Sequence, residues 1–242
     1  MRPVGTENAW FAFKGVRNDE LGVHMLSMPT RPHPARKGKL VDIPGAHGKL
    51  FQDEGAYDRI TVSLRCVAVD NINIDDISAW LSGEGFLVFG DEPERAYKAR
   101  VTKEFSRNNR MPRLRGQEFT ATFDCEPFRY QSTPVQPIEL PVSGLIENPG
   151  TVASAPLIRI DGDGDCTLTI GRNTLVFNDI TGHIYVDCDA KIAYTGEGTT
   201  ESPFVLATQH VTGEWISIEP GSNTVSCTSG KKATVTPRWR WL

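Results

Sequence analysis

Apolar and polar residues alternate over long stretches of this chain, and the alternation predicts β-strands. The clearest example is RITVSLRCVAV (59–69), where apolar side chains recur at every second position from Ile60 onward. This period places the apolar side chains on one face of a strand. QEFTATFDCEPF (117–128) alternates in the same way, and FLVFGDEPERAYKARVT (86–102) predicts two strands around a turn over 90–94.

One segment of the first half has a helical period instead. In NINIDDISAWLSGEG (71–85), the residues Ile74, Ile77 and Trp80 are spaced three apart, so they share one face of a helix. The two aspartates after Ile74 suit the positive N-terminal end of a helix, and Gly83 or Gly85 ends it. The sequence therefore predicts one α-helix.

The second half consists of short alternating segments separated by turn residues. These turn signals recur about every 8–12 residues, which is typical of an antiparallel sandwich. The proline-rich stretch QSTPVQPIELPVSGLIENPGT (131–151) separates the halves, because proline cannot donate a backbone hydrogen bond. We therefore predict a mainly β protein with an N-terminal β-sandwich or belt domain (1–133), which holds one α-helix and a long β-hairpin, and a C-terminal antiparallel β-sandwich (134–242).

Charge and composition exclude several classes of protein. Residues 1–135 hold 19 Lys and Arg against 18 Asp and Glu, and the remainder holds 7 against 12, so neither half is a basic nucleic-acid-binding module. No apolar run approaches the ~20 residues of a membrane helix, and we expect no membrane partner. The N-terminus lacks the apolar segment of a secretory signal, so we expect synthesis in a cytoplasm.

The cysteines and the motif search give no chemical site. Five cysteines are spread without a CxxC pair, which predicts reduced, mostly buried thiols. The chain lacks the HExxH, GxSxG and P-loop motifs. We therefore predict that the protein is not an enzyme and has no cofactor, with a hydrolase of cell-wall polymers as the least favoured alternative.

The sequence DGDGD contains the one candidate for a metal site, formed by Asp161, Asp163 and Asp165. Alternating carboxylates resemble the start of a calcium loop. Position twelve of such a loop would be Arg172 instead of a glutamate, and strand-like segments flank the motif. A hairpin turn rich in Asp and Gly is the favoured explanation, and calcium binding is the alternative.

Two basic segments and three tryptophans are candidates for interaction surfaces. Residues 95–115 carry eight basic residues and one acid, and TRPHPARKGK (30–39) is both basic and proline-rich. The second segment is predicted to be a mobile arm or to lie across a neighbouring subunit. Trp215, Trp239 and Trp241 could stack on sugars, although core packing or subunit docking explains them equally well.

The order of several motifs resembles the distal tail proteins of siphophages. In the first half, the resemblance rests on VDIPGAHGKLFQDEGAYDRITVSLRCVAV (41–69), the Trp80–Leu81 pair, DEPERAY (91–97) and the stretch from Phe119 to Phe128. In the second half it rests on NPGT (148–151), APLIRI, the Asp-rich turn, LTIG, YVD and the closing GSNTVS and PRWR. Each motif alone is weak evidence for the family, but together, and in this order, the motifs cover nearly the whole chain.

This resemblance implies a structural role in the virion. Distal tail proteins form a ring of six at the tip of a long non-contractile tail, and their C-terminal domains are galectin-like or similar to carbohydrate-binding modules. The implied partners are further copies of the chain, the tail-tube protein, a tail-associated or tail-fibre-type protein, and receptor-binding or baseplate proteins. DNA would pass through the channel only in transit. The implied location is the tail tip, after assembly in the host cytoplasm.

Two functions therefore compete at this stage. The leading hypothesis is a hexameric hub, and the alternative is an adsorption module that recognises host cell-wall saccharide through the three tryptophans. Ala46 and His47 stand where the family often has an arginine before the glycine, so no ring-contact arginine is carried over there. The candidates for the subunit interface are Arg31, Arg36, Lys37, Pro44, Gly45, Arg95 and Tyr97.

Overall fold

The computed structural model of the chain describes residues 9–45, 47–68, 74–102, 117–228 and 230–242. The chain divides into two compact units, Met1–Ser132 together with Leu242, and Thr133–Trp241. Antiparallel strands dominate both units, and α1 (Ile74–Trp80) is the one α-helix of the described residues. The protein is therefore mainly β, as the alternating pattern predicts.

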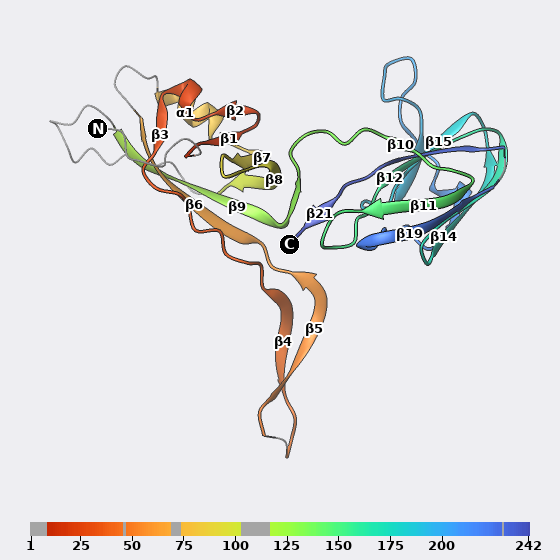
Figure 1. Cartoon of the computed structure of the whole chain (residues 1–242), viewed down its shortest axis with the longest axis horizontal. Helices are drawn as coiled ribbons and strands as arrows, with labels where there is room; N and C mark the ends of the chain where they lie inside the picture. Colours follow the sequence, from red (N-terminus) through yellow and green to blue (C-terminus); the bar gives the residue numbers. More distant parts are fainter. Residues whose placement is uncertain (1–8, 46, 69–73, 103–116, 229) are drawn as a thin grey trace. The chain divides into compact units, whose positions relative to one another are not determined.

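One antiparallel sheet organises the first unit, in the strand order β2-β1-β7-β8-β9-β6-β3 (Figure 1). The predicted strands 59–69 and 117–128 are β6 and β9, which pair so that Val62 lies opposite Phe123. The predicted hairpin of 86–102 is β7 and β8, with a tighter turn in which Phe89 already pairs with Glu92. The strands are β1 (Phe11–Phe13), β2 (Val16–Arg17), β3 (Val23–Met25), β6 (Ile60–Ala68), β7 (Glu84–Phe89), β8 (Glu92–Val101) and β9 (Gln117–Gln131), and a 3-10 turn (Asp19–Leu21) precedes β3.

The core of the first unit lies between this sheet and α1. Every second residue of β6 is buried, as the two-residue period requires. Trp80 of α1 donates a hydrogen bond of 2.9 Å from Nε1 to the carbonyl oxygen of Phe13. The Trp80 ring also stacks on Phe11 with 5.3 Å between ring centroids. The predicted helix is confirmed, and its one tryptophan anchors it to β1.

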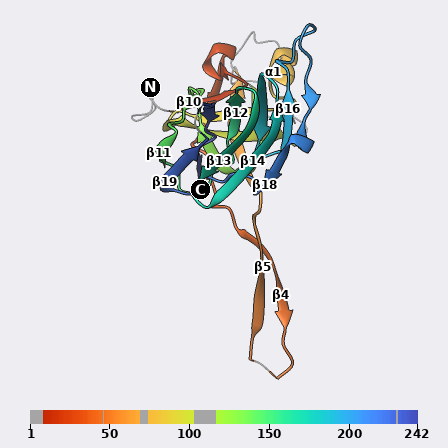
Figure 2. The same ribbon diagram turned by 90° about the vertical axis from the view of Figure 1, so that its right-hand side faces the viewer.

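A separate two-stranded ribbon, β4 (Arg36–Asp42) and β5 (Lys49–Tyr57), extends away from the sheet of the first unit (Figures 1 and 2). Leu40 lies opposite Phe51 and Val41 lies opposite Leu50. The mobile alternative for 30–39 is wrong for residues from 36 onward, because Arg36 pairs with Tyr57 and Lys39 pairs with Gln52 in this ribbon. The other alternative, contact with a neighbouring subunit, stays a prediction.

Two antiparallel sheets form the second unit, in the orders β10-β20-β12-β15-β16-β17 and β11-β19-β13-β14-β18. The first contains β10 (Ile138–Glu139), β12 (Leu157–Asp161), β15 (His183–Asp187), β16 (Ile192–Thr195), β17 (Val205–Leu206) and β20 (Lys232–Thr236). The second contains β11 (Ser143–Asn148), β13 (Gly164–Ile170), β14 (Asn173–Ile180), β18 (Val211–Gly213) and β19 (Gly221–Cys227). A 3-10 turn (Thr208–His210) and the short strand β21 (Arg240–Trp241) complete the unit.

The second unit is a sandwich, because both sheets contribute to one apolar core. Ile158, Ile160 and Val186 come from the first sheet, and Leu168 and Phe177 come from the second, all with 1% or less of their surface exposed. The alternation along each strand thus buries one face of each sheet and leaves the other face to solvent.

The DGDGD motif connects the two sheets of this sandwich. β12 ends at Asp161 in one sheet and β13 begins at Gly164 in the other. The predicted hairpin turn is therefore wrong in its topology, since the strands on either side of the motif do not pair with each other. Gly162 and Gly164 have φ values of 127° and 85°, which glycine adopts without strain.

Candidate functional site

The β4–β5 ribbon is the most exposed structured segment of the first unit. On β4, residues 36–42 are exposed except for the half-buried Gly38, and on β5, residues 49–56 are all exposed. Large apolar side chains nevertheless occur on both faces and near the tip, with exposed fractions of 41–64%: Leu40, Val41, Ile43, Leu50 and Phe51. Exposed apolar groups on a ribbon without a core are typical of a surface that binds a partner.

Local contacts hold the ribbon in its extended form. The Phe51 ring lies over Gly38, where an added Cβ would come within 2.4 Å of it. At the base, the Arg36 guanidinium lies 4.3 Å from the ring centroid of Tyr57, and the Tyr57 ring packs edge-on against Phe128 of β9 at 5.8 Å. The ribbon is thus attached to the sheet at its base and free of it beyond.

The structure separates the predicted interface residues into two groups. Arg36 and Lys37 lie on β4, and Pro44 and Gly45 lie at the tip of the ribbon, where Gly45 has a φ of 82°. All four are exposed.

The remaining candidates belong to the body of the first unit. Arg31 pairs with Asp91 and lies 5.0 Å from the ring centroid of Phe89. Tyr97 is only 7% exposed, so its main contribution is to packing, and burial raises the pKa of its phenol. Arg95 lies half-buried on β8. No described contact assigns these residues to an interface.

Oppositely charged pairs cover the outward face of β7, β8 and β9. The pairs are Arg59–Asp124, Lys98–Glu126 and Arg100–Glu84. With the half-exposed ring of Phe86 they line an open groove of about 450 Å³. The basic character predicted for 95–115 is therefore balanced by acids where the structure describes it, and residues 103–115 lie outside the described residues.

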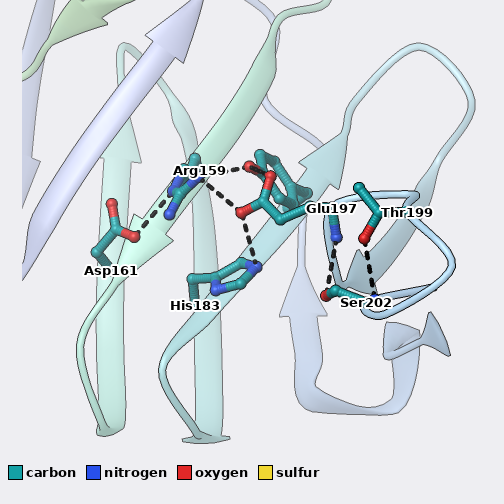
Figure 3. A network of polar contacts seen from close by, with 7 residues as sticks. Arg159, Asp161, His183, Glu197, Thr199 and Ser202 are labelled. Carbon is teal, nitrogen blue, oxygen red and sulfur yellow. Dashed lines mark hydrogen bonds and ion pairs between the residues drawn. The ribbon is translucent and has the colours of Figure 1, made fainter. Parts of the chain in front are cut away.

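A polar cluster occupies the outer face of the six-stranded sheet in the second unit (Figure 3). Arg159 donates hydrogen bonds from Nε to Asp161 Oδ1 (2.8 Å) and from Nη1 to Tyr185 Oη (2.5 Å) and Glu197 Oε1 (3.2 Å). The Tyr185 hydroxyl in turn donates to Glu197 Oε2 at 2.9 Å. His183 Nε2 lies 3.5 Å from Glu197 Oε1 and makes no hydrogen bond with the described residues.

Charge and burial shift two pKa values within this cluster. The hydrogen bond to Asp161 raises the pKa of Arg159. Burial, and then the hydrogen bond to the Glu197 carboxylate, raise the pKa of the Tyr185 hydroxyl. Both shifts further favour the protonated, hydrogen-donating form of these groups.

The candidate calcium ligands do not converge on a common point. The Asp161 carboxylate accepts the Arg159 hydrogen bond, whereas Asp163 Oδ1 accepts the backbone N–H of Gly182 at 2.7 Å. Asp165 Oδ1 accepts the backbone N–H of Asp179 at 3.1 Å. Among the described residues, no group of three or more His, Cys, Asp or Glu side chains is arranged to hold a metal. The geometry favours a turn over a calcium site, since Asp163 and Asp165 each accept a backbone N–H from a neighbouring segment.

Two of the three tryptophans, Trp239 and Trp241, do not present free indole faces. Trp239 and Trp241 are 5% and 8% exposed and belong to the core, and Trp241 Nε1 donates to the carbonyl oxygen of Pro149 at 3.1 Å. Trp215 is half-buried and packs against the same core. Stacking of a sugar on Trp239 or Trp241 is therefore wrong for this structure, because their rings are already in contact with protein.

All five cysteines are buried and unpaired by disulfides. Burial raises the pKa of Cys66, Cys125 and Cys188 to about 12. Cys166 and Cys227 lie on neighbouring strands with their Sγ atoms 3.9 Å apart. The buried thiols agree with the sequence-based prediction, and none of them forms part of the polar cluster.

The polar cluster was missed by the sequence analysis. Its members come from β12, β15 and a loop nearly forty residues further along the chain, so no local motif contains them. One feature of the sequence could have indicated part of it. Arg159 and Asp161 are two residues apart, as are His183 and Tyr185, so each pair lies on one face of its strand.

These features define a class of protein: a two-unit, antiparallel β protein that presents an exposed ribbon on one unit and a polar sheet face on the other. No helix of the described residues is long and apolar enough to cross a membrane. No protein-family model and no curated protein matches the sequence.

Similarity to solved structures identifies the fold more narrowly. The Dit protein (gp 19.1) of phage SPP1, described as a paradigm of the hub adsorption apparatus in phages infecting Gram-positive bacteria, matches with a TM-score of 0.66. The sequences are 14% identical, and the match covers 96% of this chain and 99% of that one. Two structures of the phage p2 baseplate in its activated conformation, with Sr and with Ca, match at a TM-score of 0.49 and 8% identity over 90% of each chain. The chain thus has the fold of the SPP1 Dit protein, and the resemblance to distal tail proteins is confirmed at the level of the fold.

Proposed function

We propose that this chain is a structural hub at the tip of a long non-contractile phage tail, where six copies form a closed ring. The observation that carries this proposal is the exposed β4–β5 ribbon, with apolar side chains on both faces, on a fold shared with the SPP1 Dit hub protein. The ring would join the tail-tube protein to tail-fibre-type, receptor-binding or baseplate proteins. Its location would be the virion, at the tail tip.

The ribbon supports an assembled state on energetic grounds. An isolated two-stranded hairpin is marginally stable in water, and this one exposes apolar side chains on both faces. Burying one leucine side chain fully stabilises a complex by roughly 1.5–3 kcal/mol. A neighbouring copy that covered both faces would therefore stabilise the ribbon and the ring together.

The position of the ribbon also suits ring closure. It extends from one place on the first unit, and in the proposed ring a different surface of the next copy receives it. Such a head-to-tail contact forms a closed ring when its rotation closes. Arg36, Lys37, Pro44 and Gly45 would then lie at or near the contact between neighbouring copies.

The proposed role is structural and not catalytic, and DNA would meet the protein only in transit. In the outward groove, Arg59, Lys98 and Arg100 each pair with a carboxylate. Affinity for DNA depends mainly on cations that are available to neutralise phosphates. Cations that are already paired in this way would give the groove little affinity for DNA.

Electron microscopy of the purified full-length protein tests the proposal. We expect particles with sixfold symmetry and a central opening in class averages. A preparation that contains only single protomers at concentrations well above those found during phage assembly, with or without the tail-tube protein, would contradict the proposed ring.

A further inference from the structure

Two cysteines lie next to each other at one end of the five-stranded sheet of the second unit. Cys166 is on β13 and Cys227 is the last residue of β19, and these two strands are hydrogen-bonded neighbours (Figure 2). Their Sγ atoms are 3.9 Å apart. A disulfide places its sulfur atoms about 2 Å apart, so each sulfur would have to move by only about 1 Å.

Hydrogen bonds fix the strand ends that carry this cysteine pair. The Thr167 N–H donates to Thr228 Oγ1 at 2.8 Å, and the Thr228 N–H donates to the Thr167 carbonyl oxygen at 3.0 Å. Each threonine follows one of the two cysteines in sequence. The register of the sheet therefore holds the two sulfur atoms close together, and rotation of the side chains is the motion that can join them.

The cysteine pair lies at a margin of the sandwich core. Both thiols belong to the core, with 2% and 6% of their surface exposed. However, β19 ends at Cys227 and the exposed Thr228 follows it, and the register of β13 shifts between Gly164 and Cys166. Sheets open locally most readily where a strand ends, so a reagent about the size of water has a short path to the pair.

The surroundings of Cys166 favour its thiolate form. The hydrogen bond with the Cys227 thiol lowers the pKa of Cys166 to about 7 and raises the pKa of Cys227. Lys231 also lowers the pKa of Cys166, and its ammonium group is held in place by a hydrogen bond to the carbonyl oxygen of Asp163. The thiolate is the form of cysteine that reacts with oxidants. Cys166 is therefore the nucleophile of the pair, and Cys227 is the thiol that can react with its oxidised product.

The other three cysteines have different surroundings. Cys66 lies opposite Phe119 and Cys125 lies opposite Ile60, both within the paired strands β6 and β9. Cys188 directly follows β15. Burial raises the pKa of all three thiols to about 12. These cysteines are therefore internal controls for any reaction of the pair.

We propose that Cys166 and Cys227 form an oxidative cross-linking site, at which a hydroperoxide converts the two thiols into a disulfide that ties β13 to β19. Both cysteines belong to the second unit, so the site does not depend on ring formation. On the proposed function, the protein passes from a reducing cytoplasm to an oxidising medium in the released virion, where such a cross-link persists.

The reaction balances with hydrogen peroxide as the oxidant. The Cys166 thiolate attacks one peroxide oxygen: an S–O bond forms, the O–O bond breaks, and the departing hydroxide takes up the proton that the Cys166 thiol has lost and becomes water. The Cys227 sulfur then attacks the sulfur of the resulting sulfenic acid. The S–S bond forms, the S–O bond breaks, and the hydroxyl group leaves as a second water with the proton of the Cys227 thiol. Two thiols are thus oxidised by two electrons, and one peroxide is reduced to two waters.

Mass spectrometry of the full-length protein, treated with hydrogen peroxide at mildly alkaline pH, tests the proposal. Digestion without reduction should yield two peptides joined through Cys166 and Cys227, lighter by two hydrogen atoms than the reduced pair. Cys166 should be oxidised at least about a hundredfold faster than Cys66, Cys125 or Cys188, because a far larger share of it is thiolate. The cross-link joins residues 61 positions apart, so it should raise the melting temperature of the protein by roughly 5–15 °C.

Two variants separate the cysteine pair from the other thiols. In Cys227→Ala, the sulfenic acid at Cys166 has no neighbouring thiol, so Cys166 should accumulate as sulfinic acid and the melting temperature should not rise. The matched control is Cys188→Ala, which removes a core thiol of the same unit that is 4% exposed. This control should form the cross-link as the wild type does.

Three results would overturn the cross-linking site. The first is the absence of a Cys166–Cys227 disulfide in the treated wild type, or a disulfide that joins other cysteines instead. The second is a cross-link that leaves the melting temperature unchanged, since the disulfide would then not tie the two strands. The third is a rise in melting temperature that Cys227→Ala retains or that Cys188→Ala loses. Circular dichroism of the untreated variants verifies their fold, and the wild-type digest decides the proposal where a variant does not fold.

Discussion

The ribbon makes a quantitative prediction about assembly. Leu40 and Leu50 lie on opposite faces of the β4–β5 ribbon and are 64% and 57% exposed. If a neighbouring copy covers them, each contributes roughly 1–2 kcal/mol, which is the exposed share of full leucine burial. The double variant Leu40→Ser/Leu50→Ser should therefore weaken each contact between copies by about 2–4 kcal/mol, or roughly 30- to 700-fold.

The free energy of unfolding of the single protomer should change little in this variant. Both side chains are already exposed, and substitutions at such positions usually alter stability by about 0.5 kcal/mol or less. The assay is light scattering behind size-exclusion chromatography over a dilution series. The variant should dissociate at concentrations where the wild type stays assembled, and the control Leu145→Ser, at an equally exposed leucine of the second unit, should not. A variant with the wild-type mass at every dilution would refute the role assigned to the ribbon.

Three further predictions concern the two units themselves. Trp80→Phe should destabilise the first unit by about 1–3 kcal/mol in urea unfolding, because the variant leaves the Phe13 carbonyl oxygen without its donor; an unchanged midpoint would contradict this anchoring role. Arg238 donates two hydrogen bonds to the Asp187 carboxylate (2.7 and 2.8 Å) and lowers the pKa of that carboxyl group. The pair therefore stabilises the folded protein above the ordinary aspartate pKa of 3.8, and this stabilisation is lost as the pH falls below that value. Arg238→Gln should thus melt lower than wild type at pH 7 and by a smaller margin near pH 3, and a margin independent of pH would show that the pair does not matter. Burial and the raised pKa of Cys66, Cys125 and Cys188 predict negligible labelling by a thiol reagent at pH 8 until the protein unfolds, and rapid labelling of the native protein would be inconsistent with the structure.

Local periodicity predicted the elements whose buried face is continuous in sequence. β6, β9 and α1 each bury residues at a fixed spacing, so their patterns are legible without tertiary information. Trp239 and Trp241 are buried in the core, and nothing in their local sequence distinguishes this from the sugar-stacking alternative.

Features that depend on pairing between distant segments were not predicted. The β4–β5 ribbon buries no continuous face, so its basic and proline-rich start resembled an unstructured arm. The DGDGD motif has the composition of a hairpin turn, and only the sheet topology shows that it joins two sheets. The polar cluster forms because β12 pairs with β15 and a later loop folds back over them, which no spacing of residues within one segment encodes.

The central claim of this account is assembly into a ring, and the solution mass of the full-length protein tests it most directly. Light scattering on the wild type, over a concentration series, should give six times the protomer mass of 26.7 kDa. A mass of 26.7 kDa at every concentration, unchanged when the tail-tube protein is added, would contradict the proposed hub.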